Sequence, residues 1–191
     1  MGHLDRKQRE KELVRQSILD AAIKIANREG WNSVTIRKIA DEIEYTPPIV
    51  YEHFQGKENL FKELVYMGFR IMQSDLEDLV EKEPDPKAFL MRISLGHWNF
   101  AVEHSALYQL MFSIERPTPS EEMSKSMKII KSKFTQIAKA GDDIHEIMFS
   151  WMCLINGTIS FLLFNNQPSL HFVTDEYAFF TRIIKRFFDT I

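Results

Sequence analysis

Histidine, cysteine and acidic side chains are the residues that would carry enzymatic or metal chemistry in this sequence. The six histidines and the single cysteine, Cys153, show no paired metal-ligand spacing, and no glycine-rich phosphate loop or nucleophile motif accompanies them. His97, His104 and His145 are scattered, as solvated or capping side chains often are. We therefore expect no catalytic residue, no metal site and no cofactor. Turnover with added metal or nucleotide would restore the interpretation as an enzyme.

The segment from Thr35 to Phe54 has the spacing of a different kind of functional site. It predicts two short helices separated by about three residues, with the small Ala40 where the second helix crosses the first. Ile39, Ile43 and Val50 supply apolar contacts between the two helices. A helix-turn-helix needs such a rigid pair, because it presents the start of its second helix to the major groove of DNA. A tight helical hairpin within a bundle is the alternative.

Several side chains of this segment are suited to contacts with double-stranded DNA. Arg37, in the first turn of the first helix, can reach a phosphate or a guanine edge. Tyr51 and His53 can bind phosphate or pack between helices, and Lys57 begins the next helix, whose N-terminus favours an anion. The residues that we predict to contact DNA are Thr35, Arg37, Thr46, Pro47, Pro48, Ile49, Tyr51, His53 and Lys57.

The charge distribution argues against a broad electrostatic attraction to DNA. The chain carries 24 Lys and Arg against 27 Asp and Glu, a net charge of −3, and residues 1–60 hold 10 of each kind. Residues 1–15 contain five basic and three acidic side chains, which fit either a solvated helix face or an arm that contacts phosphate. We expect DNA binding to depend on a few placed contacts and on dimerisation.

The elements that position these residues are helices, because apolar residues recur at helical spacing and no stretch alternates as a strand would. We predict an all-α fold of about nine helices, with an N-terminal three-helix helix-turn-helix domain and a C-terminal helical effector and dimerisation domain. The expected domains are residues 1–65 and 66–191. We expect helices over Thr46–His53, Lys57–Val80, Phe89–Glu103, Ala106–Ser113 and Asp142–Asn165, and a last helix that runs through Phe188. Gly30 is an expected helix stop, Gln55-Gly56 is an expected break, and Thr35, Thr118 and Thr174 are expected caps.

A longer run of residues surrounds the helix-turn-helix segment and extends over about 50 positions. It consists of Ile18-Leu19-Asp20-Ala21-Ala22, Gly30, Thr35, Ile39-Ala40, Tyr51, Phe54 and Lys57-Glu58-Asn59-Leu60. In residue type and spacing this run resembles the N-terminal domain of the TetR family of transcriptional regulators. The resemblance implies a three-helix DNA-binding domain, a fourth helix that links it to an α-helical effector domain, and a homodimer.

Two places depart from that family pattern. Glu44 stands in the turn where the family usually has glycine, and a non-glycine residue at positive φ costs about 1 kcal/mol. Pro47 and Pro48 remove two backbone donors from the helix start and leave, with Ile49, an apolar tip. We hypothesise that this tip contacts thymine methyl groups.

The second half of the sequence is rich in aromatic residues, since residues 89–191 contain 12 of the 15 phenylalanines. The predicted helix from Ile144 to Leu163 is apolar on too many sides to pack on one side only, and the last helix, with Tyr177 and Phe180, is similar. We therefore expect a homodimer in which these last two helices of each subunit form a four-helix interface. That interface would set the spacing of two recognition helices.

A second, looser resemblance concerns the expected effector domain. His97 to His104, Leu107 to Phe112, and Trp151 with Asn156-Gly157 are similar to a TetR subgroup that usually has Trp, His and Gly; here Asn156 replaces the histidine. A pocket between such helices would take a small, largely apolar effector. The residues predicted to bind it are His97, Phe100, Tyr108, Met111, Phe112, Met127, Trp151 and Asn156, each with an ordinary core role as the alternative.

The sequence contains no targeting signal that we recognise. Its first 15 residues are charged, and no segment reaches the roughly 18 uninterrupted apolar residues of a membrane span. We expect a cytoplasmic protein without membrane contact. The leading hypothesis is a dimeric repressor that an effector releases from a DNA operator. The alternative is a dimeric ligand-binding or interaction module of the same fold without operator binding, which Glu44, Glu52 and the neutral N-terminal charge would permit.

Overall fold

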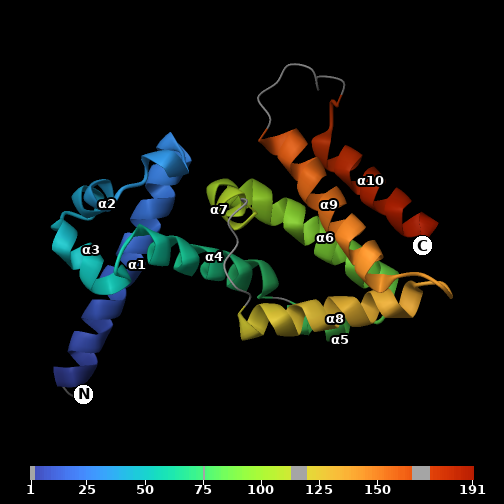
Figure 1. Ribbon diagram of the computed structural model, residues 1–191, viewed down its shortest axis with the longest axis horizontal. Coiled ribbons are helices and arrows are strands. Elements are labelled where there is room, and N and C mark those ends of the chain that lie inside the picture. The colour runs from blue at the N-terminus through green and yellow to red at the C-terminus, as the bar shows by residue number, and fades with distance from the viewer. Residues whose placement is uncertain (1–2, 75, 113–119, 165–172) are drawn as a thin grey trace. The chain divides into compact units, whose positions relative to one another are not determined.

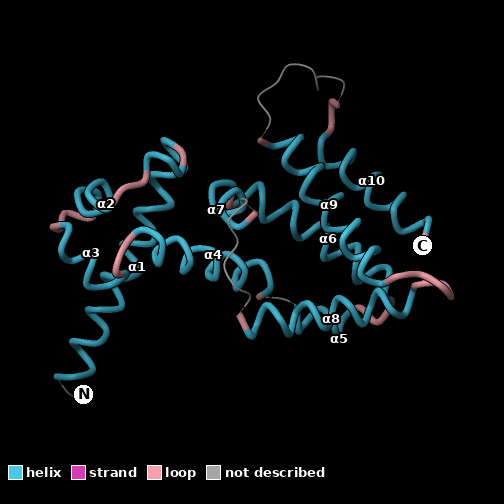
Figure 2. Tube along the Cα trace, viewed as in Figure 1, coloured by secondary structure: helices cyan, strands magenta, loops and turns pink. Residues whose placement is uncertain are grey.

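The computed structural model describes the chain except for residues 1–2, 75, 113–119 and 165–172. Within the described residues it contains ten α-helices, one short 3₁₀ helix and no strand (Figure 1 and Figure 2). The predicted all-α fold is therefore confirmed. The contacts among residues divide the chain into two compact units, and the division falls inside the fourth helix, between Gly68 and Phe69.

The first unit combines residues 1–68 with residues 105–117. Its apolar residues meet in one core, in which Ile18, Ile39, Val50 and Leu60 are completely buried. Burial of such side chains is the main force that holds short helices together, because helices of this length are marginal alone. The elements of this unit are α1 (His3–Glu29), η1 (Trp31–Ser33), α2 (Ile36–Glu42), α3 (Pro47–Phe54), the first part of α4 (Lys57–Gln73), and α7 (Ser105–Met111).

Helix α7 joins the first unit although it lies about 40 residues further along the chain than α4. The indole Nε1 of Trp31 donates a hydrogen bond to the carbonyl of Ala106, at 2.7 Å. Gly68 of α4 is buried against Leu107 and Met111, and a β-carbon at this position would collide with the Met111 sulfur. A side chain at position 68 would therefore require Met111 to move.

The predicted signals at the ends of the first three helices are confirmed. Gly30 follows α1 with φ of 80°, and the hydroxyl of Thr35 accepts a hydrogen bond from the backbone N–H of Lys38 at the start of α2. Gln55 and Gly56, with φ of 51° and 131°, separate α3 from α4. These turns orient α3 relative to α1 and α4.

The second unit consists of residues 69–104 and 118–191. Trp151 and Phe134 are fully buried at its centre, and the indole Nε1 of Trp151 donates to the hydroxyl of Ser94 at 2.9 Å. Lys87 donates to the backbone carbonyls of Phe188 and Ile191, which connects the start of α6 to the end of α10. The helices of this unit are the end of α4, α5 (Leu76–Lys82), α6 (Pro86–Glu103), α8 (Glu121–Ile137), α9 (Ile144–Leu163) and α10 (Glu176–Thr190).

The single helix predicted from Lys57 to Val80 is wrong, because two helices occupy this stretch. Helix α4 ends at Gln73, and α5 begins at Leu76. After α4 the backbone N–H of Ser74 bonds the carbonyl of Ile71, three residues back, which tightens the final turn and ends the helix. This break raises the count among the described residues to ten, against the nine helices expected.

Two predicted helix caps are also wrong by one or two residues. Ser120 caps α8 by accepting from the N–H of Met123, and Thr118 lies outside the described residues. Asp175, rather than Thr174, caps α10 by accepting from the N–H of Ala178. In each place two residues within two positions of each other are of a type that caps helices, and the sequence alone does not decide between them.

Candidate nucleic-acid interface

Helices α2 and α3 form a rigid pair through a short turn. Ile39 and Ala40 of α2 and Val50 of α3 are completely buried, and the N–H of Tyr45 donates to the carbonyl of Ala40 at 2.9 Å. Glu44 adopts φ of 59°, so the turn has the left-handed residue that glycine would occupy more easily. The side chain of Glu44 is exposed, and the tightly packed pair absorbs the cost of about 1 kcal/mol.

The start of α3 is built from Thr46, Pro47 and Pro48. Thr46 is the N-cap residue, and its hydroxyl makes no capping hydrogen bond. The two prolines occupy the first turn, where backbone N–H groups have no partner within the helix, so their missing donors cost the helix little. Thr46 and Pro48 are exposed, whereas Pro47 and Ile49 are half-buried. The outermost part of the predicted apolar tip is therefore Pro48.

Further along α3, Tyr51 and His53 have different surroundings. Tyr51 is 53% exposed and can reach a partner molecule. His53 is half-buried, and burial together with the nearby Lys11 and Arg15 lowers its pKa, against weaker opposite effects of Glu52 and Glu12. At neutral pH the imidazole of His53 is therefore uncharged, and it offers at most one neutral donor to a phosphate.

The remaining predicted DNA-contacting residues lie on α2 and at the start of α4. The hydroxyl of Thr35 is used as the cap of α2, and Arg37 is exposed within the first turn of that helix. Lys57 is half-buried at the start of α4, with its Nζ 4.9 Å from the centre of the Phe61 ring. Because all nine predicted residues belong to α2, α3, the residues before these helices or the start of α4, the structure brings them into one region of the first unit.

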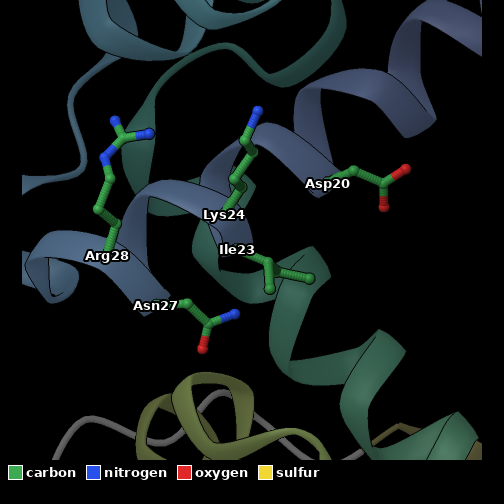
Figure 3. A pocket seen from close by; sticks show the side chains of 5 residues that line it. All are labelled: Asp20, Ile23, Lys24, Asn27 and Arg28. Atoms are coloured by element: carbon green, nitrogen blue, oxygen red, sulfur yellow. The ribbon is translucent and has the colours of Figure 1, made fainter.

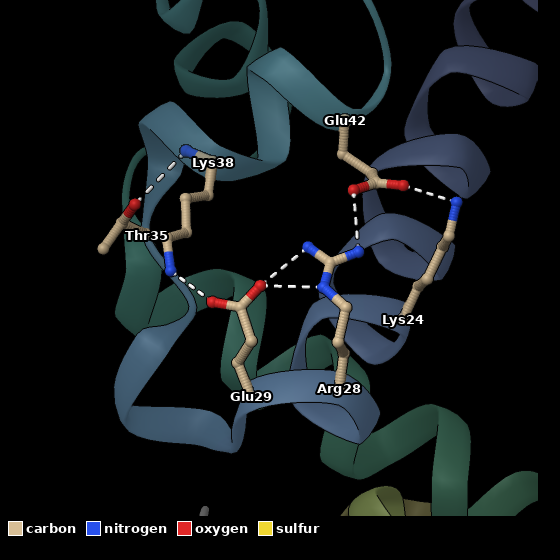
Figure 4. Close-up of polar contacts among 6 residues, drawn as sticks. All are labelled: Lys24, Arg28, Glu29, Thr35, Lys38 and Glu42. Atoms are coloured by element: carbon tan, nitrogen blue, oxygen red, sulfur yellow. Dashed lines mark hydrogen bonds and ion pairs between the residues drawn. The ribbon is translucent and has the colours of Figure 1, made fainter.

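Five charged side chains join the end of α1 to α2, and the sequence did not indicate this cluster (Figure 4). Glu42 pairs with Lys24 at 2.5 Å and with Arg28 at 3.4 Å, while Glu29 pairs with Arg28 and with Lys38. Lys38 lowers the pKa of Glu29 most, and Lys24 that of Glu42. Lys38 is thus held by Glu29. Most of these pairs join distant positions, so no local sequence signal identifies them.

Arg15 was not among the predicted site residues, although it contacts the end of α3 directly. Its Nη1 donates to the carbonyl of His53 at 3.3 Å, and its guanidinium lies 4.4 Å from the centre of the Phe54 ring. Its Nη2 also pairs with Glu63 of α4 at 3.0 Å. Arg15 therefore fixes the C-terminal end of α3 to α1 and α4.

The residues predicted to bind a ligand fall in both units. In the first unit, Tyr108 and Phe112 lie together, with ring centres 4.5 Å apart, and Met111 is buried against Gly68. In the second unit, His97 meets Trp151 edge to face, and its Nδ1 lies 2.9 Å from the carbonyl of Ile93.

The other three predicted ligand residues have ordinary helical surroundings. Phe100 packs on His104, and the amide of Asn156 donates to the carbonyl of Met152, one turn earlier. Met127 is 41% exposed on α8, so it is not part of the buried aromatic group around Trp151. Burial lowers the pKa of His97, so this imidazole is neutral at physiological pH.

Two surface hollows among the described residues bear on ligand binding. A groove of about 350 Å³ runs along α9 and α10, next to Cys153, Gly157, Phe161 and Phe179, and none of the predicted ligand residues lines it. Another hollow lies along α1, where Asp20, Ile23, Lys24, Asn27 and Arg28 line it (Figure 3).

Helix α9 is long and apolar enough to cross a membrane by length and composition, and only 17% of its most apolar window is buried in its own chain. Helices that pack in soluble proteins can have the same length and composition. The observation therefore identifies a large uncovered apolar face and does not identify its partner.

Comparison with known proteins finds a family match for the residues that form the helix-turn-helix. Residues 18–64 match the family model described as bacterial regulatory proteins, tetR family. Over 99 residues the chain is 30% identical to the HTH-type transcriptional regulator YobS of Bacillus subtilis, a match that covers 51% of this chain and 50% of that protein. The chain thus spans about half the length of the first curated relative that it matches.

Solved structures share the fold over nearly the whole chain. A protein from Rhodococcus sp. RHA1 aligns with a TM-score of 0.74 at 18% identity, covering 93% of this chain and 94% of that one. The TetR family transcriptional regulator PfmR of Thermus thermophilus aligns with a TM-score of 0.64 at 16% identity, covering 90% and 97%. Residues 18–64 thus match the tetR family of bacterial regulatory proteins, and nearly the whole chain shares the fold of these solved structures.

Proposed function

We propose that this protein is a sequence-specific DNA-binding transcriptional regulator, in which α3 enters the major groove of a double-stranded operator. The observation that carries the proposal is the rigid α2–α3 pair, which leaves Thr46, Pro48 and Tyr51 exposed along α3. DNA binding is assigned to residues 1–65, and ligand binding and dimerisation to residues 66–191.

Contact with DNA rests on shape and a few side chains rather than on strong charge. Pro48 and the half-buried Pro47 and Ile49 pack against thymine methyl groups, since they offer no side-chain donors. Arg37, Tyr51 and Lys57 contact phosphates or base edges beside this tip. The hydroxyl of Thr46, which makes no capping bond, adds a polar contact at its edge.

The protein acts as a homodimer through α9 and α10. Phe149 and Phe161 of α9 are 71% and 59% exposed in the single chain, and Tyr177 at the start of α10 is 46% exposed. Large apolar side chains in such numbers on one helix indicate a protein interface, and a two-fold interface covers the same face of both copies. The dimer sets the distance between two α3 helices, about 34–36 Å for successive major grooves.

The regulatory state is set by a small, largely apolar effector that releases a repressor from DNA. The neutral, buried His97 beside Trp151 gives the second unit an aromatic interior with one polar ring, which suits an uncharged ligand. A gamma-butyrolactone receptor of known structure shares this fold, at 17% identity and a TM-score of 0.57, so another protein of this fold is a receptor for a small molecule. The proposed location is the cytoplasm, where the operator is.

A second candidate function is a dimeric ligand-binding or interaction module of the same fold that does not bind an operator. The exposed Glu44, before α3, and Glu52, within α3, favour this alternative, because they repel phosphates.

Selection from randomised duplexes, followed by gel shift on the selected DNA and on the DNA upstream of the protein's own gene, separates the two functions. The regulator binds a two-fold symmetric site at physiological salt, with A·T pairs beneath Pro48. If the protein shifts DNA only at low salt and without sequence preference, the regulator function is excluded and the interaction module is the remaining candidate. A contact zone of G·C pairs alone beneath α3 would contradict the apolar readout.

A further inference from the structure

The N-terminal turns of α1 extend past the rest of the first unit. Helix α1 has 27 residues, and every side chain from Arg6 to Leu13 is exposed, whereas the buried residues of α1 begin at Ile18 (Figure 1). From Lys7 to Arg15 the helix rises about 12 Å. This extension adds nothing to the core, so its role must be sought in what its surface can contact.

Three of the five basic residues in the extension lie on the side of α1 that faces the core further along. In a helix, residues three and four apart share a face, so Lys7, Lys11 and Arg15 continue the row of Ile18, Ala22 and Ile25. Where α1 packs on α2 and α3 this row is apolar, and where it passes beyond them the row becomes cationic. We call Lys7, Lys11 and Arg15 the basic row.

The basic row begins at the C-terminal end of α3. Arg15 donates to the carbonyl of His53, the next-to-last residue of α3. Lys11 lies one turn before Arg15 on the same face of α1, and its charge contributes to the lowered pKa of the His53 imidazole. The row therefore continues directly from the surface that α3 offers to DNA.

The charges around the row leave its two lysines available. Arg6 pairs with Glu10, and Arg15 pairs with Glu63. No carboxylate among the described side chains forms an ion pair with Lys7 or Lys11. Two exposed ammonium groups one turn apart, next to the proposed recognition helix, carry the charge opposite to that of DNA phosphates and can each neutralise one.

We propose that Lys7 and Lys11 contact the DNA phosphate backbone beyond the base pairs that α3 reads. The proposal rests on the proposed function, and it adds a second contact surface to the same partner. It also compensates for the low net charge of the first unit, because cations are concentrated where backbone contact occurs. Phosphate contacts of this kind fix orientation and carry no sequence information.

The test compares the double variant K7Q/K11Q with the unmodified protein and with K125Q/K128Q, which removes two exposed lysines from α8 of the second unit. The slope of log affinity against log salt is measured on the selected site and on an unrelated duplex. K7Q/K11Q lowers the slope by about 1.8 per bound chain, at about 0.9 per lost contact, and K125Q/K128Q leaves it unchanged. Hydroxyl-radical footprinting then shows loss of backbone protection outside the selected base pairs for K7Q/K11Q alone.

The outcomes separate the two proposals. If the unmodified protein binds its selected site and K7Q/K11Q has the same slope and footprint, the proposed phosphate contacts of Lys7 and Lys11 are overturned. The proposed regulator function is then unaffected. An equal loss of slope in K125Q/K128Q overturns these contacts too, because the effect is then one of net charge. Absence of any sequence preference overturns the regulator, while the slope on the unrelated duplex still decides whether Lys7 and Lys11 contact phosphate.

Discussion

Arg15 of α1 and Glu63 of α4 form an ion pair, with 3.0 Å between Nη2 and Oε2. The same guanidinium covers the Phe54 ring and donates to the carbonyl of His53. One side chain therefore connects the end of the proposed recognition helix to the two long helices beside it. This arrangement orients α3 without any residue of α3 itself contributing a charge.

Removing Arg15 should destabilise the first unit measurably. The two side chains are 30% and 27% exposed, so we expect a coupling of about 1 kcal/mol between Arg15 and Glu63. The measurement is a double-mutant cycle of R15M, E63Q and the double variant, with the free energy of unfolding from urea titration. Additive effects of the two substitutions would show that the pair contributes nothing.

The hydrogen bond between Trp31 and Ala106 should hold α7 in the first unit. W31F removes the donor while keeping a ring against Phe61, whose centre lies 5.2 Å from that of Trp31, so a loss of about 1 kcal/mol is expected. W31A also loses the ring and should cost about 3 kcal/mol or more. Hydrogen exchange of α7 amides reports the attachment, and unchanged exchange in W31F would contradict it.

Substitution of Glu44 by glycine should stabilise the protein. Glu44 adopts φ of 59°, and relief of this conformation outweighs the added freedom of the unfolded chain, for a net gain of about 0.5–1 kcal/mol. Glu52, exposed within α3, is the matched control, and E52G should cost up to about 1 kcal/mol. A loss of stability in E44G would mean that the Glu44 side chain makes a contribution of its own.

Two histidines should make the protein less stable in mild acid. Burial lowers the pKa of His97, and burial with Lys11 and Arg15 lowers that of His53, so the unfolded chain binds protons more readily than the folded one. The free energy of unfolding is therefore undiminished above the histidine pKa of the unfolded chain, about 6.5, and it falls as the pH decreases through that value. Glu29 and Glu42, whose pKa values are lowered, lose their contribution only below about 4.5. Urea titrations between about pH 5 and 8 should show that the free energy of unfolding falls less with decreasing pH in H97Q than in the unmodified protein. An equal fall in both would exclude His97 as a source of the pH dependence.

The exposed phenylalanines of α9 should be essential for the proposed dimer. F149E and F161E place a charge in a desolvated interface, so each should yield monomers with unchanged helix content. V102E changes an exposed apolar residue of α6 in the same way and should remain dimeric. Sedimentation velocity distinguishes these states, and dimeric F149E and F161E would exclude α9 as the interface.

Sequence periodicity was sufficient for most of the helices and for the first functional region. The inner row of α1, Gly30, the Thr35 cap and the Gln55-Gly56 break depend on contacts within a few residues, which the order of residue types alone specifies. For the same reason, the α2–α3 pair and its apolar tip could be predicted residue by residue.

What only the tertiary structure decided involves residues far apart in the chain or choices between neighbouring ones. The break after Gln73 and the caps at Ser120 and Asp175 depend on the backbone path, which packing sets. The contacts of Arg15 with His53 and Glu63, and of Trp31 with Ala106, join segments separated by up to 75 residues. Local helix propensity does not predict such partners, because the contacts between them form and contribute to stability only when the helices pack. The helix-turn-helix was therefore readable from the sequence, whereas the side chains that hold it in position were not.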